Sequence, residues 1–157
     1  MKRNRKFLFD TNALSSFTRE SNDGYHAISS KVASLNDSDE LYASILSIYE
    51  MEYGVLHAKK QNIIAEMKEA IQFVKDEFQI VPLTDNGAKI FADIKEQYQE
   101  KKGMGKKALI KHNVDLMIAS TAIEIEAVLI TNDTKDAIPI IIKACRSDFE
   151  WEDWTKE

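Results

Sequence analysis

The stretch that decides the fold of this chain is Lys6-Phe7-Leu8-Phe9-Asp10-Thr11-Asn12-Ala13-Leu14-Ser15. An apolar run over 7–9 meets Asp10, after which the sequence turns polar. This pattern predicts a short buried strand that delivers a carboxylate to the start of a helix. In open α/β sheets, ligands bind beyond the carboxyl ends of the strands. Taken alone, Asp10 is more simply interpreted as a helix-capping residue, so a functional interpretation depends on which other residues converge on it.

The size and composition are those of a single soluble globular domain spanning residues 1–157. Apolar residues make up 44% and charged residues 30% of the sequence, which is ordinary for such a domain. No apolar run approaches the length of a membrane span, and the stretch behind the basic N-terminus is too short for a signal peptide. We therefore expect a cytoplasmic protein with no membrane partner.

Cysteine and histidine usage excludes two kinds of site. The single cysteine, Cys145, cannot form an internal disulfide or a Cys-rich zinc site, and it is interpreted as a small buried apolar residue. The three histidines, His26, His57 and His112, share no metal-ligand spacing. Histidine-based zinc chemistry is therefore not expected.

Strands and helices alternate along the chain. Besides the strand at 7–9, we predict a strand over 41–46, a proline-containing edge strand over 79–83 and a fully buried strand over 127–131. We predict helices over 11–19, 25–36, 62–78, 86–101 and 113–126, and another that begins at a Ser47 cap and ends near 60. The segment 138–142 is ambiguous, with Pro139 favouring a helical first turn, and 149–154 is a candidate fifth strand. This alternation predicts an α/β sandwich of three layers around a central, mainly parallel sheet of four to five strands.

The net charge of −5 argues against a nucleic-acid partner, but the charge is unevenly distributed. Between residues 101 and 111 the chain carries two glycines, no acid and a group of lysines, for which we predict a flexible loop. This loop is interpreted either as a solvated segment or as a surface that holds an RNA backbone. The lysines concerned are Lys101, Lys102, Lys106, Lys107 and Lys111.

Four acids occupy comparable places relative to the predicted elements. Asp10 ends the first strand, Glu50 lies in the first turn of the helix after the second strand, and Asp133 directly follows the strand at 127–131. In a doubly wound sheet, C-terminal strand ends and the first turns of the helices they feed share one edge, so these three acids are expected to meet there. The helix that holds Asp115 precedes a strand instead, and simple alternation assigns its first turn to the opposite edge.

A stripe of small residues nevertheless separates Asp115 from ordinary surface charge. Asp115, Ala119 and Ala122 lie on one side of the predicted helix, where small side chains permit close approach of a neighbouring element. The carboxylate that begins this stripe is expected to point inward. The alternative is that Asp115 merely stabilises the positive end of its helix.

Three or four carboxylates cannot share a pocket unaided, because like charges raise each other's pKa. A hard divalent cation resolves the repulsion, and oxygen ligands without cysteine or histidine indicate Mg²⁺ or Mn²⁺ rather than zinc. Such an ion generates a hydroxide nucleophile and neutralises phosphate oxygens. The acids therefore suggest hydrolysis of phosphodiesters.

Four short motifs follow one another in the chain. They are Phe-Asp10-Thr11-Asn12, the stretch 44–54 with Glu50 four residues before glycine, the stretch 115–122 that begins with aspartate, and the stretch 129–136 with Asp133 and Asp136. Their order and spacing over residues 6–136 resemble those of the PIN-domain ribonucleases, and most of all the VapC-type toxins of bacterial toxin–antitoxin pairs. The chain departs from that pattern at Ala137, where phenylalanine is common, and in the longer and more apolar segment that follows.

The resemblance implies a Rossmann-like PIN fold and an endoribonuclease that hydrolyses RNA with a metal-activated water, leaving a 3′-hydroxyl and a 5′-phosphate. It implies a Mg²⁺ or Mn²⁺ cofactor, a cognate antitoxin protein as partner, and a homodimer or a toxin–antitoxin hetero-oligomer. The catalytic and metal-binding acids implied by the resemblance, which brings the third of them into the pocket, are Asp10, Glu50, Asp115 and Asp133.

The resemblance also assigns supporting roles. Asp136 would be an outer metal ligand, and Thr11 and Asn12 would orient Asp10 or its bound water. Glu52, out of register by two positions, is a lesser alternative to Glu50.

Three other functions are weighed against the toxin. One is a housekeeping nuclease of the same fold, and another is a non-catalytic PIN-like RNA-binding module, which an incomplete acid set would favour. A phosphotransferase with Asp10 as nucleophile is disfavoured, because that chemistry commonly uses a second carboxylate two residues further on, where this chain has Asn12.

Overall fold

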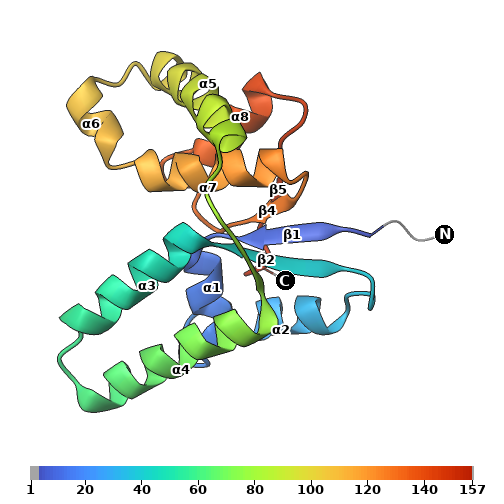
Figure 1. Cartoon of the computed structure of the whole chain (residues 1–157), viewed down its shortest axis with the longest axis vertical. Helices are drawn as coiled ribbons and strands as arrows, with labels where there is room; N and C mark the ends of the chain where they lie inside the picture. The colour runs from blue at the N-terminus through green and yellow to red at the C-terminus, as the bar shows by residue number, and fades with distance from the viewer. Residues whose placement is uncertain (1–3, 157) are drawn as a thin grey trace.

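The structure, a computed structural model, describes residues 4–156 and has the three-layer α/β architecture that the sequence predicts (Figure 1). Within this range the chain forms five strands and eight helices. In chain order these are β1 (Lys6–Phe9), α1 (Thr11–Thr18), α2 (Tyr25–Ala33), β2 (Glu40–Ser44), α3 (Ile45–His57), α4 (Gln61–Glu77), β3 (Gln79–Val81), α5 (Asp85–Lys102), α6 (Lys106–Ile110), α7 (Asn113–Glu124), β4 (Val128–Ile130), α8 (Ile138–Cys145) and β5 (Glu150–Glu152).

The central sheet is parallel throughout, with the strand order β3-β2-β1-β4-β5. β1 lies in the middle, and its last residue, Phe9, pairs with Ala43 of β2 and Ile130 of β4. β3 is an edge strand and Pro82 follows it directly, as the sequence predicts for a strand with a proline. The predicted parallel sheet of four to five strands is therefore confirmed.

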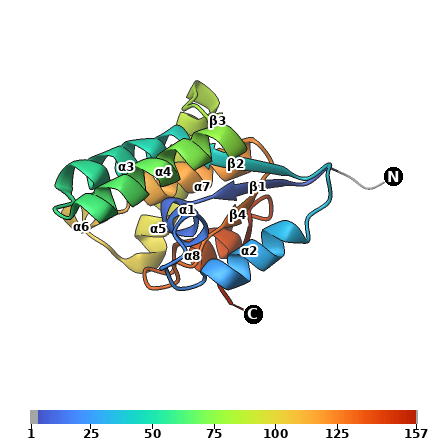
Figure 2. The same ribbon diagram turned by 90° about the horizontal axis from the view of Figure 1, so that it is seen from below.

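Alternation along β1 sends its side chains into two separate cores. Leu8 packs into the cluster beneath α5, α7 and α8, whereas Phe7 and Phe9 pack into the cluster formed with α1 to α4. The aromatic ring of Trp154 covers the second cluster, with its centroid 4.9 Å from that of Phe7 and 5.6 Å from that of Phe9. The two helical layers lie above and below the sheet in Figure 1, and Figure 2 shows α1, α3 and α4 in front of the strands.

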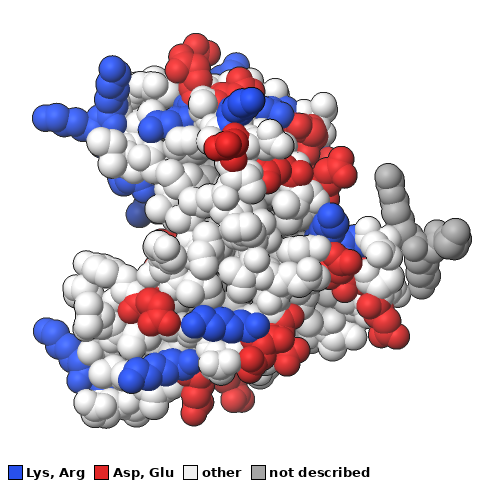
Figure 3. Space-filling model, in the orientation of Figure 1, with Lys and Arg blue, Asp and Glu red and all other residues white. Residues whose placement is uncertain are grey.

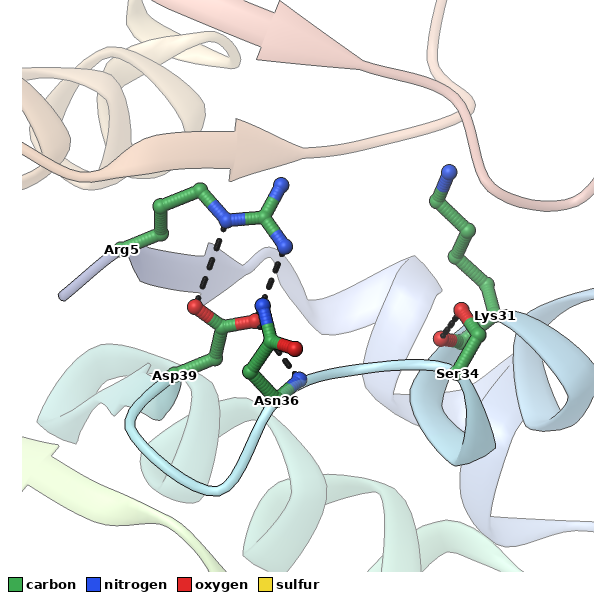
Figure 4. Close-up of polar contacts among 5 residues, drawn as sticks. All are labelled: Arg5, Lys31, Ser34, Asn36 and Asp39. Atoms are coloured by element: carbon green, nitrogen blue, oxygen red, sulfur yellow. Dashed lines mark hydrogen bonds and ion pairs between the residues drawn. The ribbon is translucent and has the colours of Figure 1, made fainter. Parts of the chain in front are cut away.

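The amino end of β1 is fixed to the loop before β2 (Figure 4). The Arg5 guanidinium donates from Nε to Asp39 Oδ1 at 3.3 Å and from Nη2 to Asp39 Oδ2 at 2.9 Å. The Asn36 backbone N–H donates to the same carboxylate at 3.0 Å, and the Glu40 backbone N–H donates to the Arg5 carbonyl at 2.8 Å. These bonds set the register in which β1 and β2 end at the same edge of the sheet.

The start of α3 corrects one prediction. The cap is Ser44, whose Oγ accepts from the Leu46 backbone N–H at 3.1 Å, and the helix begins at Ile45. The predicted cap, Ser47, is instead buried inside the helix, and β2 ends two residues earlier than predicted. Both serines interrupt the same apolar run, so only the pairing of β2 in the sheet selects between them.

Two further segments differ from, or complete, the sequence predictions. The lysine-rich segment predicted as a flexible loop contains helix α6, because Leu109 is only 3% exposed and anchors that turn in the core. The ambiguous segment at 138–142 belongs to α8, with Pro139 in its first turn. The candidate fifth strand is present as β5. Among the helices of residues 4–156, none is both long and apolar enough to cross a membrane.

Candidate active site

Asp10 follows β1 directly and caps helix α1. Its Oδ1 accepts a hydrogen bond from the Ala13 backbone N–H at 2.8 Å, so the capping interpretation is correct. Its carboxylate also bonds to the side chain of Thr131, and its backbone N–H donates to the Ile130 carbonyl at 3.0 Å. The carboxylate that caps the helix therefore also lies at the carboxyl edge of the sheet, where it contacts the end of β4.

Asp133 is presented by the turn that follows β4. The Asp133 backbone N–H donates to Thr131 Oγ1 at 3.0 Å, while the Thr131 backbone N–H donates to the Glu152 carbonyl at 3.1 Å. Thr131 is buried and contacts both Asp10 and the backbone of Asp133. This threonine therefore links the two acids, as their expected meeting at one edge requires.

Asp115 reaches the same edge, contrary to the prediction from simple alternation. It lies in the first turn of α7, the helix that leads into β4. A helix that leads into a parallel strand ends at the amino edge of the sheet, so its first turn lies at the carboxyl edge. In Figure 1, α7 accordingly begins to the left of the strands, and α3 starts beside the left ends of the strands. Ala119 and Ala122 are fully buried, so the predicted stripe of small residues does pack inward.

The three aspartates line one small cavity of about 10 Å³, which is about the room that a single water molecule needs. Thr131 and an apolar wall complete the lining, the wall being formed by Ile118, Leu129, Ile138 and Pro139. A much larger hollow of about 800 Å³ lies between α2 and the C-terminal segment, and none of the predicted site residues lines it. Chemistry rather than size therefore identifies the site.

The electrostatics of the cavity reflect acids that are packed without a counter-charge. Burial, helped by the charges of Asp115 and Asp133, raises the pKa of Asp10 to about 7, although the hydrogen bonds from Thr131 and Ala13 oppose the shift. Burial also raises the pKa of Asp115 to about 6, with added contributions from Asp133, Glu50 and Asp136. Each raised pKa means that ionisation is disfavoured in the pocket as it stands.

Glu50 flanks this cavity rather than lining it. It is exposed on α3, and Thr11 Oγ1 donates to Glu50 Oε1 at 2.6 Å. The buried Ser47 lies behind Thr11, with 2.9 Å between the two hydroxyl oxygens. The charge of Glu50 still raises the pKa of Asp115. Thr11 therefore orients Glu50, whereas the sequence assigned Thr11 to Asp10 or its water.

The remaining predicted residues lie around the rim. Asp136 is half-buried; its carbonyl accepts from Tyr98 Oη at 2.8 Å, and its charge contributes to the raised pKa of Asp115. Asn12 is exposed in the first turn of α1. Glu52 is also exposed, on α3.

Sequence reasoning missed three supporting residues: Thr131, Ser47 and His112. A hydroxyl residue ending an otherwise apolar strand was the available signal for Thr131, because a buried hydroxyl needs a partner. Ser47 was noticed only as a cap. His112 was noticed only for its lack of metal-ligand spacing, and no pattern in the sequence shows that it is buried beside Asp136.

The donor set of this site suits a hard divalent cation. All the acids offer carboxylate oxygens, and two of them have pKa values raised by burial and by the neighbouring acids. The cavity between three of them is the size of a single water or ion. In residues 4–156, no group of three acidic, histidine or cysteine side chains is already drawn together as a closed metal site. A bound cation would therefore have to draw the carboxylates inward, and the residues fit it in chemistry and in size.

The fold and the site define the class of protein: a three-layer α/β domain with a pocket of carboxylates at the carboxyl edge of its parallel sheet. The sequence model of the PIN domain matches residues 7–138. The chain therefore belongs to the PIN domain family, and PIN domains are nucleases.

Solved structures with the same fold are toxin–antitoxin complexes. VapBC-1 from nontypeable Haemophilus influenzae matches with a TM-score of 0.70 and 23% identity, covering 96% of this chain and 99% of the other. VapBC2 from Rickettsia felis, bound to a DNA fragment from its promoter, matches with a TM-score of 0.68 and 22% identity, covering 95% and 98%. FitAB bound to an IR36 DNA fragment matches with a TM-score of 0.71 and 21% identity, covering 96% of both. No curated protein matches the sequence.

Proposed function

We propose that this chain is a VapC-type toxin: an endoribonuclease, dependent on Mg²⁺ or Mn²⁺, that belongs to a toxin–antitoxin pair. The observation that carries the proposal is the convergence of Asp10, Asp115 and Asp133 on one water-sized cavity. These acids lie directly after β1, in α7 and in the turn after β4, so elements far apart in the sequence contribute to one cavity. The family assignment supports nuclease activity, and the toxin–antitoxin structures of the same fold support the biological role.

The cation would be held by the aspartates of the cavity, with Glu50 at its flank and Asp136 further out. When bound, such an ion supplies charge for the phosphate oxygens and a lowered pKa for a water molecule. The residues of the chain prepare the site for it: Thr131 and the Ala13 backbone N–H hold the Asp10 carboxylate in place, and the Thr11 hydroxyl holds that of Glu50.

The RNA path is proposed to run over the lysine-rich segment. Its five lysines are all exposed and surround the short helix α6. Figure 3 shows Lys and Arg side chains at the left end of the upper helical layer, and a hollow that opens on the left between the upper and the lower layer. Because α7, whose first turn carries Asp115, begins on that side, an RNA strand held by the lysines would lie near that carboxylate. Local positive charge can bind a phosphate backbone even on an acidic protein.

The proposed partner is an antitoxin that closes the acidic pocket with a cationic group or covers its mouth. An exposed apolar stripe on α3 offers a contact surface beside Glu50, since Tyr49 is 68%, Tyr53 64% and Leu56 79% exposed. Alternatively, a second copy of the chain would cover this stripe and form a homodimer. The expected cytoplasmic location follows from the proposed RNA substrate and stays a prediction.

The test is cleavage of single-stranded RNA by purified protein with Mn²⁺ or Mg²⁺, with EDTA as the metal-free comparison. Asp115→Asn should abolish cleavage without unfolding the protein. Asp37→Asn is the matched control, because the same substitution there alters an exposed loop that precedes β2 at the amino edge of the sheet. Cleavage that survives Asp115→Asn, or that persists in EDTA, would refute the proposed mechanism.

Two further readouts separate the alternatives. Growth arrest on induction, relieved by the product of a small neighbouring gene, identifies a toxin, whereas cleavage without arrest identifies a housekeeping nuclease. Binding of RNA with no cleavage and no Mn²⁺ uptake identifies a non-catalytic module. Mapping the cleaved ends should give a 3′-hydroxyl and a 5′-phosphate.

A further inference from the structure

His112 is a buried imidazole whose hydrogen-bonding groups are unused. It precedes α7 directly, its side chain is only 2% exposed, and neither ring nitrogen has a hydrogen-bond partner in the described part of the chain. Buried polar side chains nearly always have a partner, so each exception needs an explanation.

The group that the imidazole faces is Asp136. The distance from His112 Nδ1 to Asp136 Oδ2 is 3.9 Å, which exceeds a hydrogen bond by about 1 Å. Tyr98 holds both residues: its hydroxyl donates to the Asp136 carbonyl at 2.8 Å, and its ring packs edge-on against the imidazole with centroids 5.6 Å apart. The ring and the Asp136 backbone are therefore fixed, and the Asp136 carboxylate, 37% exposed, is the movable member of the pair.

We propose that His112 is a positioning residue, which donates a hydrogen bond from Nδ1–H to the Asp136 carboxylate and holds that carboxylate beside Asp115. This inference rests on the proposed nuclease function and adds a residue to it. A side-chain rotation that moves the Asp136 carboxylate by about 1 Å makes the bond. The hydrogen bond is needed because Asp136 and Asp115 repel each other, and an unrestrained carboxylate would turn toward solvent.

The surroundings of the ring favour the tautomer that this bond requires. A neutral imidazole donates from one nitrogen and accepts at the other. An unpaired buried N–H is rarer in proteins than an under-used acceptor. Placing the proton on Nδ1 directs the donor toward Asp136, whose Oδ2 is the one carboxylate oxygen that the described structure places within 4.0 Å of a ring nitrogen. Groups that orient ligating carboxylates in this way typically change activity by about 10- to 100-fold when removed.

The first experiment measures RNA cleavage by a set of four variants. His112→Phe keeps an aromatic ring against Tyr98 and removes both nitrogens, and it should lower kcat about 10-fold with little change in KM. His112→Asn, whose amide can place a donor near the position of Nδ1, should recover part of that loss. In an Asp136→Asn background, His112→Phe should have less than about a twofold further effect, because the two residues act through one bond. Full additivity of the two substitutions would overturn the proposal.

The second experiment observes the imidazole directly and does not need cleavage. Nitrogen-15 NMR of the three histidines reports the ring tautomers; His112 should carry its proton on Nδ1, and Asp136→Asn should shift that signal. A proton on Nε2 instead, or no response to Asp136→Asn, overturns the proposal. If the wild-type protein cleaves no RNA at all, the proposed function fails and this measurement still decides the role of His112.

A matched control separates positioning from general loss of stability. Ile94 is fully buried on α5, one turn before Tyr98, and is not among the residues that line the cavity of the aspartates. Ile94→Val should leave kcat and the His112 signal unchanged even where its urea midpoint falls as far as that of His112→Phe. An equal loss of kcat in both variants would show that His112 only fills space.

Discussion

Replacing Asp10 with asparagine should make the protein more stable at neutral pH while abolishing its proposed activity. Asparagine caps helices as well as aspartate does, so the bond from the Ala13 N–H is retained and only the charge is removed. The pKa of Asp10 is raised from 3.8 to about 7 in the folded protein. At about 1.4 kcal/mol for each pKa unit, the charged Asp10 carboxylate destabilises the folded protein by at most about 4 kcal/mol.

The direction in which stability changes with pH follows from proton linkage. The folded state keeps the Asp10 proton until about pH 7, whereas the unfolded chain releases it near 3.8, so between these values the folded state binds more protons. The free energy of unfolding therefore falls as pH rises through this window, and the penalty is complete above it. At pH 4 the wild type and Asp10→Asn should be similarly stable, and at pH 7.5 the variant should be more stable by up to about 4 kcal/mol.

Urea unfolding in EDTA at pH 4 and pH 7.5 measures this difference. Asp37→Asn is the control and should show no pH-dependent difference from the wild type. Adding Mn²⁺ at pH 7.5 should stabilise the wild type, because a ligand that binds only the folded state shifts the equilibrium toward it, and should stabilise Asp10→Asn far less. Equal stability of wild type and Asp10→Asn at both pH values would refute the reasoning that this carboxylate is buried without a counter-charge.

Two further predictions concern the helix end before β4 and the RNA path. Glu126 is exposed and has a left-handed backbone (φ 59°) at the end of α7, where its N–H donates to the Ile123 carbonyl at 3.2 Å and the next N–H donates to the Ala122 carbonyl at 2.9 Å. Glu126→Gly should raise the free energy of unfolding by about 0.5–1 kcal/mol in urea, and a decrease would contradict the reading of strain there. Lys107→Gln should weaken RNA binding and reduce the slope of log affinity against log salt by about 0.7; an unchanged slope would remove Lys107 from the RNA path.

The centre of the fold was predictable from the sequence because local and global signals agree there. An apolar run that ends at Asp10 becomes the central strand and its helix cap, and the buried run before Thr131 becomes β4. The cap of α3 was misplaced because Ser44 and Ser47 look alike in an apolar run. The helix α6 was missed because a single buried residue, Leu109, stabilises it.

The site was partly predictable for a similar reason. The carboxyl edge of a parallel sheet collects whatever follows its strands, so Asp10 and Asp133 were assigned without a structure. Asp115 was assigned to the wrong edge because a helix that precedes a strand was expected to begin at the amino edge, whereas a helix that connects parallel strands begins at the carboxyl edge. Only the family resemblance brought Asp115 into the pocket. The contacts of Thr131 and His112 depend on distances between elements far apart in the chain, which no local pattern carries.

The position of β1 in the middle of the sheet has a consequence for when this protein can act. Its residues leave the ribosome before both of the strands that flank them, which come from residues 40–44 and 128–130. During synthesis β1 can pair with β2 once residues 40–44 have emerged, but its other edge stays unpaired until β4 has been made, more than a hundred residues later. The pocket that Asp10 shares with Asp133 can therefore form only after most of the chain has been synthesised.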